Sequence, residues 1–569
     1  MKNEELLGSL IQRHRAGQIS RRTFIKTLTL LGVSASTAGA LAACTAPATP
    51  SPIAAPTKAP AAPTTAPAPA PTTAPAPAAT KAPSPAATTA AAAGAPKKGG
   101  TLRRGWQPPT QLDPALQASS TEIAACAQIY DWLVWIDEKN QPVKALAESW
   151  ESNKEATVWT FTLRKGVTFH SGKALVADDV VFTFNRLRDK SIGAATSSLY
   201  ANVNDVKALD ASRVQFTLAK ANPELPADLG DYHAGIVASN TTDFKKTFNG
   251  TGPFILERFS PEDRATFKRN PNYWLSDMPY LDALQDIYSP QQSSQVEALR
   301  GGQLDVVMGL PAELAESLKK EGKTAILQSE PNLHFVIHMR SDRKPASDVK
   351  VRQALKAATD RSAILQAARL GYGVTGRDTP IGPIYGDYYL NVPEPKRDVA
   401  KAKQLLKEAG YDKLDIQLMA QNSFDVPKIA VVWKEQLAEA GVNVDIKVVP
   451  PDVYYQDDGW LQVDFGITEW GLRATPQPYF QLAYTTGAKW NESHWSDPEV
   501  DQLAAQAASE LDRAKRAEAY KKIQQIFIDR GPIIVPYFEA TVVATSPKVK
   551  GLVVHPDFPR STMRTVYME

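Results

Sequence analysis

The stretch from Val158 to Arg188 constrains the fold of this chain more than any other part of the sequence. Large apolar residues alternate with threonine as far as Leu163, which is the period-2 pattern of a strand with one buried face. Lys165-Gly166 is expected to turn the chain into a second short strand at 167–169. A helix should follow, with Asp178 as its N-cap and an apolar stripe along one side. This order predicts a protein in which strands and helices are mixed.

Further segments after this stretch have equally definite patterns. They are GTGPF (250–254), NPNYW (270–274), ALRGGQLDVV (298–307), VKVRQALKAATDR (349–361), DVAKAKQLLKEAGY (398–411) and DPEVDQL (497–503). Together with the first stretch, and in this order, they resemble the large extracytoplasmic solute-binding proteins of ABC importers. The group is family 5, which holds dipeptide-, oligopeptide-, nickel- and some oligosaccharide-binding members. The resemblance covers roughly residues 99 to 555 and, as a set of motifs, is highly specific.

The resemblance implies an α/β fold with two lobes, of the periplasmic-binding-protein type called class II or cluster C. Such a fold has a hinge and a cleft between its lobes. Lobe I is expected to comprise residues 99–340 and 537–569, including a strand-rich subdomain at about 131–250. Lobe II is expected to comprise residues 341–536. The family works as a monomer without a cofactor, closes on a solute and delivers it unchanged to the transmembrane subunits of an ABC permease.

The residues of the second half support a layered α/β lobe independently of the resemblance. Apolar residues alternate at 414–418 and again at 442–448, and a helical pattern at 427–440 separates them. Such a strand, helix and strand predict a right-handed crossover between parallel strands. We expect the chain to cross between the lobes near 339–344 and again near 536–540.

The N-terminus is typical of an export signal. Ser20 to Lys26 reads SRRTFIK and precedes a moderately apolar run that ends in LAAC at Cys44. The paired arginines resemble a twin-arginine signal, and LAAC resembles the lipobox of bacterial lipoproteins, in which the cysteine is lipidated. Residues 1–43 are therefore expected to be removed, and Cys44 to anchor the protein to the outer face of the cytoplasmic membrane. The alternatives are an uncleaved apolar N-terminus and a soluble secreted product.

Residues 44–98 have the composition of a linker. They consist almost entirely of Ala, Pro and Thr, and PTTAPAPA occurs in tandem at 63–70 and 71–78. Because such a segment has almost nothing to bury, we expect a disordered, extended tether. At about 3.1 Å per residue it could reach roughly 150 Å from the membrane.

Charge argues against nucleic acid as a partner of the remaining 471 residues. The first 98 residues hold 10 of the 64 basic residues and 2 of the 61 acidic ones, so 54 basic and 59 acidic residues remain. No basic excess is left to neutralise phosphates. Cys44 and Cys126 are the only cysteines. With Cys44 lipidated, Cys126 would have no partner, and we expect it to be a buried residue of an apolar helix.

Two other functions remain open at this point, a hydrolase and a metal-chelate (nickel-type) binding protein. The sequence holds no HExxH, no GxSxG and no cysteine with activating neighbours, so a hydrolase would lack a recognisable nucleophile. His334 and His338 could share one face of a strand, but a metal pair needs a third ligand, and the sequence nominates none. No catalytic residue and no metal site are predicted.

The segment EWGLRATPQ at 469–477 bears on the choice of solute. In peptide-binding relatives an Asp stands three residues after this Trp and pairs with the peptide's α-ammonium; here the position is Arg473. A guanidinium cannot accept from an ammonium, but it suits a carboxylate, a phosphate or sugar hydroxyls. The alternative is that Arg473 points to solvent or pairs with a neighbouring Asp.

Other ligand-binding candidates follow from aromatic content and from the resemblance. Trp460, Trp470, Trp490 and Trp495 lie within one span of 36 residues, and Trp470 is predicted to stack on the solute. Asn491 matches a family position near the cleft. The loop that contains Gln117, Ser119 and Ser120 is expected to contribute from lobe I. We expect an oligosaccharide or another polar organic solute before a peptide, and a peptide before a metal chelate.

Overall fold

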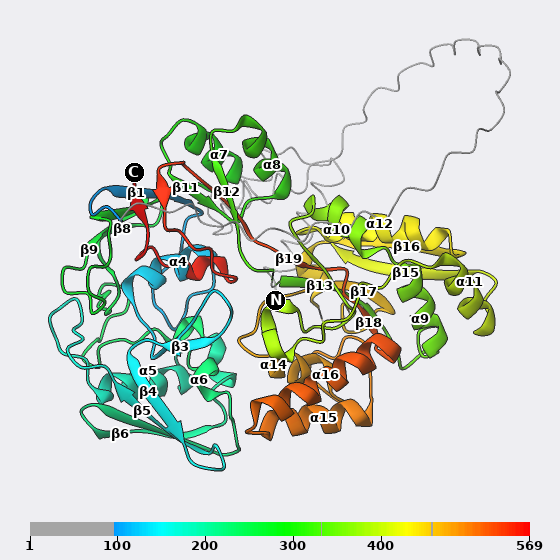
Figure 1. The fold of residues 1–569 in the computed structure, drawn as a ribbon, viewed down its shortest axis with the longest axis horizontal. Helices are drawn as coiled ribbons and strands as arrows, with labels where there is room; N and C mark the ends of the chain where they lie inside the picture. Colours follow the sequence, from blue (N-terminus) through cyan, green and yellow to red (C-terminus); the bar gives the residue numbers. More distant parts are fainter. Residues whose placement is uncertain (1–95, 332, 457–458) are drawn as a thin grey trace, which may run out of the picture. The chain divides into compact units, whose positions relative to one another are not determined.

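The computed structural model describes residues 96–331, 333–456 and 459–569. These residues belong to one compact unit, Ala90–Glu569 (Figure 1). The predicted signal peptide, the predicted lipidation site Cys44 and nearly all of the predicted tether lie outside the described residues.

The first sheet, sheet I, forms the base of one lobe (Figure 1). It contains β1 (Thr101–Trp106), β8 (Phe254–Ser260), β9 (Arg264–Arg269), β10 (Ala283–Tyr288), β11 (Val306–Met308), β12 (Ala325–Gln328) and β20 (Val542–Thr545). The strand order is β12, β20, β11, β1, β10, β9, β8. β1 runs parallel to β10 and β11, whereas β9 and β20 are antiparallel to their neighbours. β8 and β9 pair with each other as an antiparallel hairpin.

Helices cover both faces of sheet I. α4 (Ser120–Ile129) packs on the face that includes Leu102 and Trp106, and Cys126 is buried there, as predicted. α7 (Gln292–Arg300) and α8 (Ala312–Glu321) pack on the opposite face. Alternation along β1 produces this division, because Leu102, Arg104 and Trp106 point to one side, whereas Arg103 and Gly105 point to the other.

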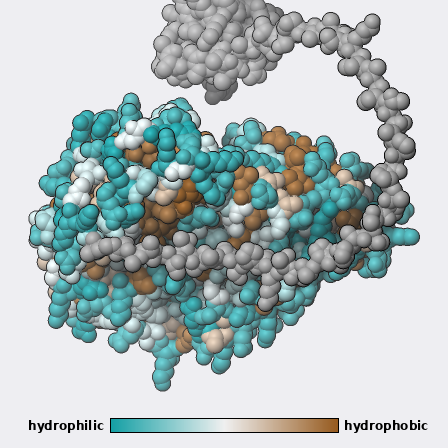
Figure 2. Space-filling view, turned by 45° about the horizontal axis from the view of Figure 1, so that its top comes forward, coloured by the Kyte–Doolittle hydropathy of each residue, from teal (hydrophilic) through white to brown (hydrophobic). Residues whose placement is uncertain are grey.

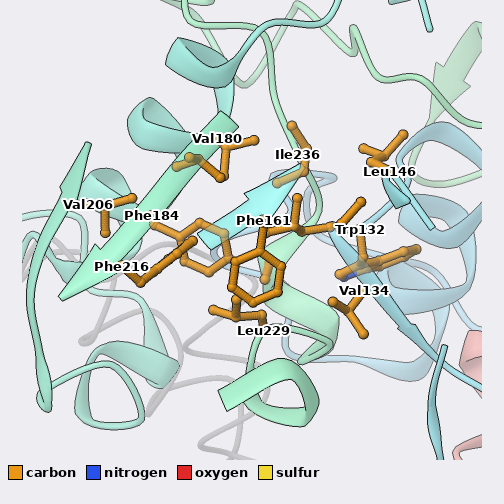
Figure 3. Packing of buried hydrophobic residues seen from close by; sticks show 14 of the residues in the cluster. Trp132, Val134, Leu146, Phe161, Val180, Phe184, Val206, Phe216, Leu229 and Ile236 are labelled. Carbon is orange, nitrogen blue, oxygen red and sulfur yellow. The ribbon is translucent and has the colours of Figure 1, made fainter. Parts of the chain in front are cut away.

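A strand-rich subdomain extends from the same lobe. Its sheet has the order β4 (Ala147–Ser152), β5 (Val158–Leu163), β7 (Arg213–Leu218), β6 (Val203–Asp210), and α5 (Ala177–Arg188) packs on it. Phe161, Phe184 and Phe216 meet at the centre of its core (Figure 3). The rings of Phe184 and Phe216 lie 5.0 Å apart, edge to face, which is a favoured aromatic geometry. β2 (Val134–Ile136), β3 (Pro142–Lys144) and α6 (Leu225–Asp228) adjoin this core.

The stretch from Val158 to Arg188 forms the strand and the helix that its pattern predicts, with smaller differences. β5 and α5 are present, but the expected strand at 167–169 is only an isolated bridge between Thr168 and Ala174. The N-cap is Val176 and the helix begins at Ala177, two residues earlier than an N-cap at Asp178 would place it. Asp179 explains the difference, because its carboxylate accepts from the backbone of Val176 at 3.0 Å and fixes the start of the helix.

The second sheet, sheet II, forms the base of the other lobe (Figure 1). It contains β13 (Leu333–Met339), β14 (Gly373–Thr375), β15 (Leu414–Gln421), β16 (Val442–Val449), β17 (Phe465–Trp470), β18 (Ile533–Ile534) and β19 (Tyr537–Glu539). The order is β14, β19, β13, β17, β15, β16, and β18 also pairs with β13. β15 is parallel to β16 and β17. With α12 (Val426–Ala438) between them, β15 and β16 confirm the predicted strand–helix–strand unit.

Sheet II lies between helical layers. α9 (Val349–Ala358), α10 (Arg361–Arg369), α11 (Val399–Glu408) and α12 cover one face, and α14 (Gln477–Tyr479), α15 (Pro498–Ser509) and α16 (Arg513–Arg530) cover the other. Phe335 and Ile337 on β13 point to the first layer and Val336 to the second, so this strand is apolar on both faces. α9 and α10 are separate helices, because Asp360 caps the second one by accepting from the backbone of Ala363.

The connections between the lobes differ from the expected boundaries. The chain leaves sheet I after β12 and enters sheet II at β13, so the first crossing precedes Leu333 and not Met339. It returns between Glu539 at the end of β19 and Val542 at the start of β20. The pairing of β13 with β17 and β19 accounts for the difference, since it binds residues 333–339 to sheet II.

Shorter elements complete the described chain. They are η1 (Ala195–Ser198), η2 (Tyr232–Ala234), η3 (Pro383–Tyr388), α13 (Pro451–Tyr454), η4 (Phe480–Tyr484), β21 (Val549–Lys550), η5 (Phe558–Arg560) and β22 (Tyr567–Met568). Among the described residues, no helix has both the length and the apolar character that crossing a membrane requires. Hydrophilic residues cover most of the face drawn in Figure 2, and hydrophobic residues gather there in separate patches.

Candidate functional site

A cavity of about 800 Å³ lies where residues of both sheets and of the second connection meet. Its walls include residues at or just beyond the carboxyl ends of four strands. They are Trp106 of β1, Met308 of β11, Phe424 and Asp425 after β15, and Arg473 after β17. In sheets with parallel strands, ligands bind outside the carboxyl ends of those strands. Here the corresponding ends of both sheets contribute to one cavity, whose volume is typical of a small-molecule site.

The wall from sheet I is aromatic. The rings of Trp106 and Phe558 are stacked with centroids 6.1 Å apart and planes inclined by 9°. Gly309 approaches Phe558 so closely that a Cβ at this position would lie 2.9 Å from the ring, and its φ is +68°. A side chain at position 309 would therefore be strained and would displace the ring. Tyr232 adds a third aromatic residue to this wall.

The loop 117–120 contributes only part of what was expected. Ser119 and Ser120 line the cavity. The Ser119 hydroxyl caps α4 by accepting from the Glu122 backbone, and Glu122 in turn accepts from the Ser119 backbone. Gln117 does not reach the cavity. Its buried amide donates to the carbonyls of Pro114 and Tyr232, so it holds the loop in place instead of facing a solute.

Arg473 lies on the cavity wall, in the loop after β17. Its backbone carbonyl accepts from Tyr385 Oη at 2.9 Å and from Asn140 Nδ2 at 3.1 Å, so both lobes fix the loop. The Nε atom is buried and has no hydrogen-bond partner among the described residues. Within the same residues, no carboxylate oxygen lies within 4.0 Å of the guanidinium, which therefore has no paired Asp. The head group remains available to an acceptor brought by a solute.

Trp470 does not line the cavity, and the stacking role expected for it has to be corrected. Its side chain is 4% exposed and packs against Tyr479, Tyr484 and Trp490, with ring centroids 5.9 to 6.2 Å away. Its Nε1 donates to Glu492 Oε1 at 3.3 Å. The indole points to the face of sheet II covered by α14 to α16, where it forms part of the core.

Asn491 is also away from the cavity. Its side chain is buried, donates to the Trp495 carbonyl at 2.7 Å and accepts from the Trp495 backbone at 3.0 Å. These bonds close a turn, so the predicted contact with solute is replaced by a local structural role. Asn491 borders a separate, open depression beside Lys489 and His494.

A group of charged residues on the same cavity was not predicted. Arg369 lies 3.0 Å from Glu539 and 3.5 Å from Asp425, and Lys428 lies 3.6 Å from Asp425 and also contacts Glu313 of α8. Burial raises the pKa of Glu539 to about 7, although Arg369 opposes the shift. Burial and the neighbouring Glu539 likewise raise the pKa of Glu469 to about 7. The Lys428–Glu313 contact joins the two lobes at this edge of the cavity.

His334 and His338 are core residues of β13. Both are fully buried, and burial lowers the pKa of His338 to about 3, so that its ring is neutral. His334 packs between Tyr479 and Phe538. In the described part of the chain, no group of three or more His, Cys, Asp or Glu residues is arranged to hold a metal ion.

Comparison with known proteins identifies the family of this chain. The model of bacterial extracellular solute-binding proteins, family 5 Middle, matches residues 141–492. The dipeptide-binding protein of Escherichia coli is 30% identical over 491 residues, which cover 79% of this chain and 91% of that protein. A glutathione-binding protein of Pectobacterium atrosepticum is 27% identical over 472 residues, which cover 79% of this chain and 90% of that protein.

Solved structures give the same result. HbpA2 from Haemophilus parasuis has a TM-score of 0.75 and 26% identity, with 83% of this chain and 100% of that chain covered. The binding protein DppA from Helicobacter pylori, in complex with the peptide STSA, has a TM-score of 0.66 and 26% identity, with 83% and 99% covered. The two-lobed fold, the cavity at the strand ends of both sheets and the family match agree: this chain belongs to the bacterial extracellular solute-binding proteins of family 5.

Proposed function

We propose that this protein captures a polar organic solute with a carboxylate or similar acceptor group, and that Arg473 binds that group. The observation that carries the proposal is the unpaired guanidinium of Arg473 on the cavity shared by the two lobes. Several relatives are named as peptide-binding proteins, so a peptide-like solute is one candidate. The resemblance implies that relatives of that kind have an Asp where this chain has Arg473. Such a solute would therefore present its carboxylate, and not its ammonium, at this position.

A thermal-shift screen of the full chain tests the proposed solute class. Short peptides with a free carboxylate, the same peptides amidated at the carboxyl end, and neutral oligosaccharides form the panel. A solute at about 100 times its dissociation constant should add roughly 2.7 kcal/mol to the free energy of unfolding. We expect shifts from the free carboxylates that amidation reduces. Equal shifts from amidated and free peptides, or shifts from neutral oligosaccharides alone, would contradict the proposal.

The delivery step places the protein outside the cytoplasmic membrane. We propose export by the twin-arginine route, lipidation of Cys44 and a tether at 44–98 that lets the monomeric binding unit reach an ABC permease. The sequence of residues 20–44 and the membership in an extracellular family support this. Replacing Cys44 with Ser should move the protein from the membrane fraction to the soluble extracytoplasmic fraction. An unchanged membrane fraction in that variant would contradict the lipid anchor.

A further inference from the structure

Phe424 is an unusual residue on the cavity wall. It lies in the loop between β15 and α12, and its side chain is 68% exposed, more than any other large hydrophobic residue of the described chain. Single exposed apolar residues are common on protein surfaces. An aromatic ring that is exposed at the edge of a ligand cavity is a different case, because a bound solute can cover it.

The backbone of Phe424 is unusual as well. Its φ is +52°, in the left-handed region that bulky residues rarely adopt. Glycine or asparagine would adopt this conformation at lower cost. A phenylalanine at this position is strained by its backbone conformation and is not buried in a core. Neither the local conformation nor core packing therefore explains why the residue is a phenylalanine. Strain of this kind concentrates at functional sites.

The aromatic wall of the other lobe complements Phe424. Trp106 and Phe558 are stacked and line the same cavity, whereas Phe424 comes from the end of a strand of sheet II. Trp106 Nε1 is buried and has no hydrogen-bond partner in the described residues. The cavity therefore has aromatic surface from both lobes, together with the cationic head group of Arg473.

We propose that Phe424 is a specificity-determining residue, which closes over a flat apolar group of the solute from the side opposite the Trp106–Phe558 stack. Aromatic rings stack favourably in offset or edge-to-face arrangements, so a planar group gains contact with both lobes when they close. This inference rests on the proposed function and adds to it. The solute would carry an aromatic or comparably flat apolar moiety besides its carboxylate.

Calorimetric titration of the full chain with matched probes tests the inference. The pairs are Ala-Phe with Ala-Ala, and hippurate with N-acetylglycine, which differ by a phenyl ring and share a carboxylate. We expect the ring-bearing probe of each pair to bind about tenfold more tightly, which corresponds to about 1.4 kcal/mol. Phe424→Ala should reduce this ratio to about threefold or less. Phe424→Trp should keep the ratio, because it keeps a ring.

Val431→Ala is the matched control. Val431 is also an exposed apolar residue, 51% accessible, and it lies on α12 away from the cavity wall. Its replacement should leave both ratios unchanged. If Phe424→Ala preserves the preference for ring-bearing probes, or if the native chain has no such preference, the inference is wrong while the proposed function stands. If none of the probes binds, the proposed carboxylate-bearing solute class is contradicted, and so is this inference, which depends on it.

Discussion

Replacing Arg473 with alanine should weaken the binding of a carboxylate-bearing solute by about 30- to 100-fold, because a charged hydrogen bond between buried groups contributes roughly 2–3 kcal/mol. Nothing in the described part of the chain competes for this guanidinium, since its Nε has no partner and no carboxylate oxygen lies within 4.0 Å. The guanidinium is therefore available to the acceptor group of the proposed solute. Calorimetric titration of the native chain and of the Arg473→Ala variant measures the loss.

Two further variants separate charge from geometry at this position. Arg473→Lys keeps the charge but loses the planar fork, so it should recover only part of the affinity. Arg258→Ala removes a guanidinium whose side chain is 64% exposed on β8, outside the cavity, and should not change binding. A decrease of less than about threefold in Arg473→Ala would show that the solute does not contact this side chain, because threefold is well below the value of one charged hydrogen bond.

Much of the fold could be predicted because its signals are local. Alternation at 414–418 and 442–448 with a helical pattern between them gave β15, α12 and β16, and the parallel pairing followed from the length of the crossover. The position of the lobe boundary before β13 could not be predicted from such local patterns. Which sheet β13 joins depends on its pairing with β17 and β19, and these strands lie more than 100 residues away in the sequence.

The site was predicted less well, and Trp470 shows why. Adjacent residues of a strand point to opposite faces, and the sequence does not say which face meets the cavity. Glu469 and Trp470 are both at the end of β17, yet the indole enters the core beneath α14 to α16. Arg473 was predicted from the resemblance, because it stands three residues after Trp470, where peptide-binding relatives are expected to have an Asp. Its position in the loop beyond β17 places it on the cavity wall although the indole of Trp470 points into the core. The rule that ligands bind beyond the carboxyl ends of parallel strands, applied to β15, would have directed attention to Phe424 and Asp425.

The most buried ion pair of the described chain supports the aromatic wall of the cavity. Arg104 on β1 and Asp286 on β10 are opposite each other in the parallel register, and both side chains are 0% exposed. Their contact is bidentate, with Nε–Oδ1 at 2.7 Å and Nη2–Oδ2 at 2.9 Å. The Arg104 guanidinium also lies 5.9 Å from the Trp106 ring. The pair therefore joins the centre of sheet I to the aromatic wall of the cavity.

Arg104→Met should lower the free energy of unfolding by about 3–5 kcal/mol, because it leaves the Asp286 carboxylate buried without a counter-charge. Burial already raises the pKa of Asp286, and Arg104 is the group that opposes this shift. The double variant Arg104→Met with Asp286→Leu should regain most of the loss, since two apolar side chains can replace a buried pair at little cost.

Lys98→Met breaks a pair whose side chains are 53% and 78% exposed, and should change stability by less than about 1 kcal/mol. Urea denaturation followed by circular dichroism measures all three. If the double variant is as unstable as Arg104→Met alone, the loss comes from the packing of Arg104 against Trp106 and not from the uncompensated carboxylate.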